Sequence, residues 1–116
     1  MRDLKTIKFA RTVKADMELA KLCPNNSIKN LKAYVSGGDT PTNLQHIMNV
    51  IVVLSQAYEE KKHFEDPSYE MNPITYEELL YYSEEEVLHL SNIAFIDFNE
   101  DGKTTIEAEP KKASAE

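Results

Sequence analysis

Apolar residues that recur at a regular spacing are concentrated in one run in the middle of the chain, from Leu44 to Tyr58. One helical stripe of this run consists of Leu44, Ile47, Met48, Ile51, Leu54, Ser55 and Tyr58. Val50, Val53 and Ala57 widen the stripe, so a helix here is apolar around most of its circumference and belongs at the centre of a bundle. The run is shorter than the ~20 residues that a membrane-spanning helix needs, so we expect a core helix.

The β-branched residues of this run would also suit a buried strand. Length favours a helix, because the pattern continues into the charged segment EEKKH without a glycine or proline. Thr40 and Pro41 open the helix as a capping residue and a first-turn proline, and we expect the helix to continue to about His63.

Three elements are predicted before the central helix. The segment LKTIKFA is typical of a short strand or an extended arm, with Ile7 and Phe9 on one side. A helix then runs from Thr12 to about Cys23 and ends there, because the residue before Pro24 is pushed out of helical geometry. Its apolar stripe is formed by Ala10, Val13, Met17 and Ala20, with Leu19 and Leu22 beside it. A second, short helix carries Ile28, Leu31 and Val35, with Asn25, Asn26 and Ser27 as its caps.

Two further helices are predicted after the central one. The loop EDPSYEMNP separates them from it, because its two prolines forbid a long regular element. Thr75 with Glu78, and Ser83 with Glu86, are capping boxes that each start a helix. The clustered acids of these first turns favour the positive ends of helix dipoles. We therefore expect a mainly α small helical bundle.

The pattern is lost from Lys103, and residues 103–116 are predicted to form a flexible polar tail behind a single compact domain, residues 1–102. A competing interpretation makes AFIDF and TTIEAE the strands of a hairpin around the turn pair Asp101-Gly102. Residues 93–109 are therefore either helix or hairpin.

Charge is unevenly distributed along the 116 residues. The first 35 residues hold eight Lys or Arg against three Asp or Glu, a net charge of +5, so the remainder carries −12 of the total of −7. Such asymmetry indicates either a basic face for nucleic acid or two parts that attract each other on folding. The second is favoured, because no aromatic residues interleave with the basic ones. The single cysteine excludes an intrachain disulfide, and with no apolar signal segment we expect a cytoplasmic protein.

The sharpest local motif is the segment Asp97–Gly102, which matches the first half of a calcium-binding EF-hand loop. The second half fails, because Ala108 stands where the bidentate glutamate is required. A weak calcium module is therefore a lesser alternative to a turn or a helix end. The three histidines lack the spacing of a zinc site, and Cys23 has no helix N-terminus to activate it. We expect no catalytic residue, no cofactor and no metal.

A partner-binding surface is the remaining possibility for function. Tyrosine is common at protein contacts because it combines a large apolar body with a polar tip, and Tyr81 and Tyr82 lie beside Leu80 among acidic residues. The apolar stripe of the last helix is the other candidate, with Val87, Leu90, Ala94 and Phe98. Both sets would also suit ordinary core positions.

The order of these parts resembles the tail assembly chaperones of long-tailed bacteriophages and prophages. The resemblance rests on the segments LKTIKFARTVKADMELAKLCP, LSQAYEEKKHF, EDPSYEMNPIT, EELLYYSEEEVLHL and TTIEAEPKKASAE, which cover nearly the whole chain. In that family a translational frameshift near the end of a small helical protein yields a longer form, and Lys111-Lys112 would be encoded by an A-rich stretch suited to slippage.

The resemblance implies a non-enzymatic role in the cytoplasm of the bacterial host and absence from the mature virion. Such a chaperone coats the tape measure protein, keeps its hydrophobic helix soluble and helps to recruit tail tube subunits, with homo-oligomers as a further expectation. The alternative is a small acidic interaction protein that inhibits a host protein. Both need only a surface that binds a partner.

Overall fold

The computed structural model describes the backbone of residues 2–107 and the side chains of residues 2–95. This part of the chain contains no β-strand, which confirms the mainly α prediction. Its α-helices are α1 (Val13–Leu22), α2 (Leu31–Ser36), α3 (Thr40–Glu65), α4 (Tyr76–Leu79) and α5 (Glu84–Glu107), and short 3-10 turns lie at Leu4–Thr6, Pro24–Asn26 and Ile28–Asn30.

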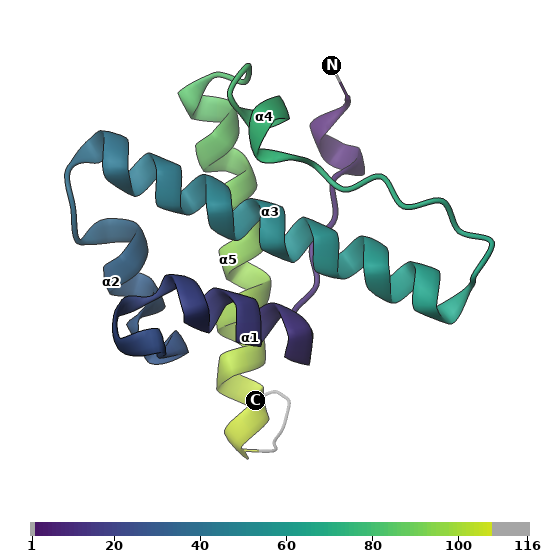
Figure 1. Ribbon diagram of the computed structural model, residues 1–116, viewed down its shortest axis with the longest axis horizontal. Helices are drawn as coiled ribbons and strands as arrows, with labels where there is room; N and C mark the ends of the chain where they lie inside the picture. Colours follow the sequence, from purple (N-terminus) through teal and green to yellow (C-terminus); the bar gives the residue numbers. More distant parts are fainter. Residues whose placement is uncertain (1, 108–116) are drawn as a thin grey trace.

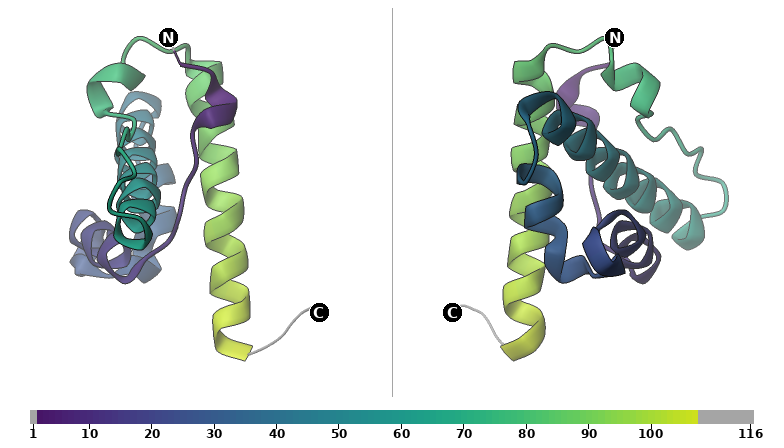
Figure 2. Two further views of the ribbon diagram at one scale, coloured as in Figure 1. Left: turned by 90° about the vertical axis from the view of Figure 1, so that its right-hand side faces the viewer. Right: turned by 60° about the vertical axis from the view of Figure 1, so that its left-hand side comes forward.

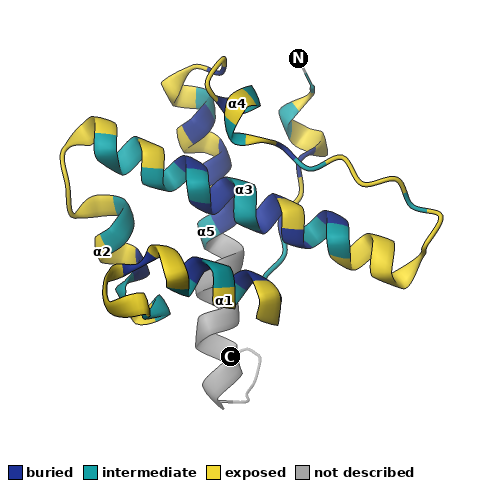
Figure 3. Cartoon of the chain, viewed as in Figure 1, coloured by how far each residue is buried: buried dark blue, intermediate teal, exposed yellow. Residues whose placement is uncertain are grey.

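The helix α3 is the centre of the molecule, as its apolar run predicts. It contacts each of the other four helices, and its buried residues include Val50, Ile51, Leu54 and Ala57. Figure 1 shows α3 crossing α5, with α1 and α2 alongside it, and the buried positions gather at this crossing (Figure 3). Burial on several sides of one helix is what an apolar circumference requires.

The start of α3 differs by one residue from the prediction. Asp39 rather than Thr40 is the N-cap, and its carboxylate accepts a hydrogen bond from the backbone N–H of Thr42 at 2.8 Å. This backbone hydrogen bond lowers the pKa of Asp39. Pro41 still lies in the first turn, where its missing N–H costs nothing.

The N-terminal segment is an extended arm rather than a strand. After the turn Leu4–Thr6 it passes between α5 and the layer that holds α1 and α3 (Figure 2). Ile7 and Phe9 are buried in the core on this path, as their alternation predicts. The N–H of Ala10 donates to the carbonyl oxygen of Leu54 in α3 at 3.1 Å, which anchors the end of the arm.

The helix α1 begins and ends as predicted, but it presents a different face to the core. The hydroxyl of Thr12 caps it by accepting from the N–H of Ala15 at 3.1 Å, and it ends at Leu22 before Cys23 and Pro24. Val13 and Met17, which the predicted stripe places inside, are 78% and 60% exposed. The buried face carries Ala15, Leu19 and Cys23 instead, so the predicted stripe was wrong.

The chain reverses direction tightly around α2. Asn25 and Asn26 have φ values of 58° and 52°, a left-handed conformation that asparagine tolerates better than most residues. At the other end of α2, a side chain at Gly37 would place its Cβ 2.6 Å from the carbonyl oxygen of Ala33. Only glycine fits this approach, and α3 begins shortly afterwards.

The loop between α3 and α4 is held against α3 by two buried polar side chains. The hydroxyl of Ser55 accepts from the N–H of Ile74 at 3.1 Å. The carboxylate of Glu59 accepts from the hydroxyl of Tyr69 at 2.8 Å and from the N–H of Asn72 at 2.9 Å. These bonds satisfy backbone groups that have no secondary structure to pair with, so an irregular loop can pack on the core.

The last helices begin at the predicted capping residues. At α5 the capping box is reciprocal, since the Ser83 hydroxyl accepts from the N–H of Glu86 and the Glu86 carboxylate from the N–H of Ser83. At α4 only half of it forms, with Thr75 accepting from the N–H of Glu78. The side chain of Glu78 accepts hydrogen bonds from Arg2 and Tyr82 instead.

The backbone of α5 stays helical through Glu107. The hairpin alternative is therefore wrong, and the predicted domain boundary at Gly102 falls inside a helix. The segment Asp97–Gly102 is helical as well, so the loop that a calcium site of the EF-hand type needs is not formed. Residues 108–116, the greater part of the predicted tail, lie outside the described residues.

Candidate partner-binding surface

A groove of about 670 Å³ lies between the turn Ile28–Asn30 with α2, the helix α3 and one side of α5. We call it the α2–α5 groove. Its apolar lining consists of Ile28, Leu31, Val35, Ile47 and Phe95, and its polar lining of Lys29, Lys32, Ser36, Ser91 and Asn92. Leu31 is buried, whereas Ile28, Val35 and Ile47 are only partly covered by the rest of the chain. The groove therefore offers apolar surface that a bound side chain would cover.

The α2 wall of the groove is fixed to α3 through Tyr34. Its ring stacks on that of His46, with the ring centroids 3.9 Å apart and the planes 7° from parallel. Nδ1 of His46 lies 2.6 Å from the carbonyl oxygen of Tyr34, and since a carbonyl only accepts, this nitrogen donates. Asn49 donates to the Tyr34 hydroxyl at 3.1 Å. A wall held by three contacts makes the groove a preformed one.

The two lysines of the groove are exposed and three residues apart, at the junction of the turn Ile28–Asn30 with α2. Among the described side chains neither Lys29 nor Lys32 forms an ion pair. One rim of the groove is therefore positively charged, although the whole chain carries −7.

A second hollow of about 490 Å³ continues along α5 towards its N-terminal end. It shares Asn92 with the α2–α5 groove and is also lined by Glu84, Glu85, Leu88 and His89. The two hollows follow one face of α5, on which Leu88, Asn92 and Phe95 succeed one another at helical spacing. This face is basic beside α2 and acidic at the start of α5.

The predicted stripe of α5 lies on the core-facing side of this helix, next to the face that lines the groove. Val87, Leu90 and Ala94 are buried against the rest of the bundle, so in this conformation they have no surface for a partner. They are ordinary core residues, which was the alternative interpretation of this stripe. Phe98, the fourth residue of the stripe, lies outside the described side chains.

The two predicted tyrosines differ from each other. Tyr81 is 81% exposed, beside the exposed Leu80, at the turn between α4 and α5. It stays a candidate contact residue. Tyr82 is buried, and its hydroxyl donates to Oε2 of Glu78 at 2.7 Å. Burial, aided by this hydrogen bond, raises the pKa of Tyr82 to about 12.

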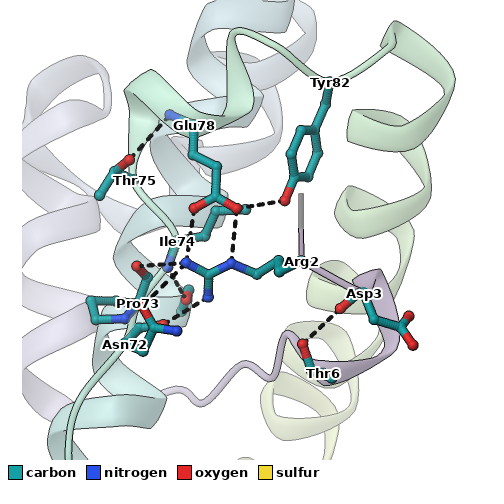
Figure 4. Close-up of polar contacts among 10 residues, drawn as sticks. Arg2, Asp3, Thr6, Asn72, Pro73, Ile74, Thr75, Glu78 and Tyr82 are labelled. Atoms are coloured by element: carbon teal, nitrogen blue, oxygen red, sulfur yellow. Dashed lines mark hydrogen bonds and ion pairs between the residues drawn. The ribbon is translucent and has the colours of Figure 1, made fainter.

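Tyr82 belongs to a polar cluster that closes the end of the molecule around Arg2 (Figure 4). The guanidinium of Arg2 donates to both carboxylate oxygens of Glu78. It also donates to the carbonyl oxygen of Asn72 at 2.8 Å. Burial acts to raise the pKa of Glu78, but the hydrogen bonds from Arg2 and Tyr82 outweigh it and lower that pKa. Every polar atom of the Glu78 carboxylate is used within the fold, which makes this cluster structural.

Groups with reactive chemistry are separated from one another. Cys23 is buried, and burial raises the pKa of its thiol, which opposes a role as nucleophile. His46 stacks on Tyr34, while Nδ1 of His63 bonds the carbonyl oxygen of Tyr69 at 2.9 Å. Within residues 2–95 no three His, Cys, Asp or Glu side chains are grouped so that they could hold a metal ion. No helix of the described chain is long and apolar enough to cross a membrane.

The uneven charge of the sequence is partly neutralised by folding. Arg2 pairs with Glu78, and Nζ of Lys14 lies 3.1 Å from Oε2 of Glu60. Both pairs join the basic first third to the acidic remainder, which supports the interpretation that the two parts attract each other.

The groove itself escaped the sequence reasoning. Its residues come from α2, α3 and α5, of which α5 is far along the chain from the other two, and no local motif joins them. The available signal was the stripe of Ile28, Leu31 and Val35, with lysines between its members.

Comparison of the chain with protein-family models, curated proteins and solved structures finds no match.

Proposed function

We propose that the protein is a non-enzymatic tail assembly chaperone of a long-tailed phage or prophage. In this role it binds the tape measure protein, keeps it soluble in the host cytoplasm and helps to recruit tail tube subunits, and it is absent from the mature virion. The proposal starts from the resemblance of the sequence to the tail assembly chaperones. The structural observation that supports it is the α2–α5 groove, a preformed apolar channel at the surface of a small helical bundle.

The groove suits one helix of a long amphipathic partner. Helix-in-groove recognition places apolar side chains, spaced three or four residues apart, into a hydrophobic channel. Ile28, Val35 and Ile47 provide partly exposed apolar walls for such side chains. A chain with a net charge of −7 that covers such a helix would also keep the complex dispersed by mutual repulsion.

The test is co-expression with the tape measure protein encoded in the same phage or prophage genome. We expect the tape measure protein to be insoluble alone, and to become soluble and co-purify when the chaperone is present. Val35→Glu places a charge in the groove and should abolish both effects. The matched control is Val13→Glu, because Val13 is 78% exposed on α1 and does not line the groove.

Circular dichroism of both variants establishes that each is folded before binding is compared. If the wild-type chain leaves the tape measure protein insoluble and does not co-purify with it, the proposed function is wrong. If Val35→Glu and Val13→Glu solubilise the partner equally, the function stands but the groove is not its surface.

A further inference from the structure

We infer that the α2–α5 groove selects a partner helix that carries acidic residues beside its apolar face, through Lys29 and Lys32. The inference rests on the proposed function, since it assumes that the groove receives a helix. It adds the charge pattern that the helix must have and states which part of that pattern lies beside α2.

The two lysines line the same hollow as the apolar residues. Their spacing of three residues at the start of α2 brings both ammonium groups to one rim. Some of the other basic residues of the first third have acidic partners, as Arg2 has Glu78 and Lys14 has Glu60. Among the described side chains Lys29 and Lys32 have none, so their charge is available to a ligand.

The other end of the same face carries the opposite charge. Glu84 and Glu85 line the hollow that continues along α5 and shares Asn92 with the groove. From Glu85 to Phe95 the helix rises about 15 Å, or about three turns. A helix in the groove is therefore attracted by its acidic residues beside α2 and would be repelled by acidic residues at the start of α5. The acidic residues must lie at one end of the bound segment.

Local charge rather than net charge decides this preference. A chain with −7 repels acidic ligands at long range and attracts basic ones, so a non-specific effect would favour a basic helix. Preference for an acidic helix has to come from the rim. Two partly exposed ion pairs should strengthen binding by about three- to tenfold over a neutral helix.

The test uses three labelled peptides with one identical apolar helical face. Beside that face, in one terminal turn, they carry Glu, Gln or Lys, and binding to the full chain is measured by fluorescence anisotropy at low and at high salt. We expect the Glu peptide to bind tightest and the Lys peptide weakest. The difference should shrink as salt rises, because exposed charges are screened.

The variant Lys29→Glu with Lys32→Glu should reverse this order. Its matched control is Lys5→Glu with Lys8→Glu, which changes the net charge equally at two exposed positions of the N-terminal arm and should preserve the order. If the control also reverses the order, the preference is a general charge effect and the inference is wrong.

Two other outcomes separate this inference from the proposed function. Equal affinity for the three peptides, or a preference that salt leaves unchanged, would overturn the role of the lysines while the groove remains a helix site. If no peptide binds, the groove is not a helix site and the inference falls, whereas the chaperone role is still decided by the solubility of the tape measure protein.

Discussion

Arg2 holds Glu78 in a two-pronged ion pair, in which Nε donates to Oε2 and Nη2 donates to Oε1, each at 2.8 Å. The two residues are 76 positions apart, and both side chains are about three-quarters buried. Two parallel hydrogen bonds fix the planes of both groups, so the pair determines where the N-terminal arm meets α4.

The first prediction concerns the strength of this pair. In a double-mutant cycle with Arg2→Met and Glu78→Gln, we expect a coupling free energy of about 1–2 kcal/mol, because the contact is charge-assisted and mostly shielded from water. Urea unfolding of the four proteins measures it. A coupling near zero would show that this ion pair does not help to hold the arm in place.

The second prediction follows from the lowered pKa of Glu78. Below the ordinary value of 4.5 the unfolded chain takes up a proton at this carboxyl before the folded chain does, so acid reduces the free energy of unfolding. The stability that Glu78 adds is present above pH 4.5 and is lost as the pH falls through the lowered pKa. The advantage of wild type over Glu78→Gln should therefore shrink from neutral pH to about pH 3.

Urea unfolding of both proteins at several pH values checks this. Other carboxylates with lowered pKa values, such as Asp39 and Asp66, are present in both proteins, so their contributions cancel in the difference. A constant difference across the range would contradict the prediction.

The third prediction tests the central position of α3. Ile51 is 0% exposed, so Ile51→Ala should remove about 2–5 kcal/mol from the free energy of unfolding by leaving a cavity. The control Gln45→Ala lies on an exposed position of the same helix and should change it by less than about 0.5 kcal/mol. Thermal unfolding should show one transition in both variants, because α3 contacts every other helix.

The fourth prediction tests which face of α1 is inside. Leu19→Ala should cost about 2–5 kcal/mol of stability, whereas Met17→Ala should cost less than about 0.5 kcal/mol. Leu19 is fully buried and Met17 is 60% exposed, although the two are only two residues apart. Chemical denaturation distinguishes the two faces directly, and a larger loss from Met17→Ala would restore the stripe expected from the sequence.

The sequence was most informative where one residue type has one physical role. The apolar run of α3, the capping residues Thr75 and Ser83, and the proline after Cys23 all predict local structure, and each lies where it was expected. These signals depend on backbone geometry and on neighbours within a turn.

Packing partners were harder to predict. The apolar residues of α1 allow two faces, and the one chosen in the fold depends on where α3 passes. Ser55 and Glu59 look like interruptions of an apolar pattern, but they are the acceptors that hold the following loop. The stripe of Val87, Leu90 and Ala94 was visible as apolar, but only its neighbours show that it faces inward. The groove needs α5 beside the distant helices α2 and α3, so no local pattern could reveal it.

The polar cluster around Arg2 also bears on how the protein folds during its synthesis. A ribosome delivers the arm first and α4 much later, so the nascent chain carries Ile7 and Phe9 before α5 exists to cover them. Exposed apolar side chains on an unfinished chain are prone to aggregation. Closure of this fold therefore waits until α4 and α5 have been synthesised.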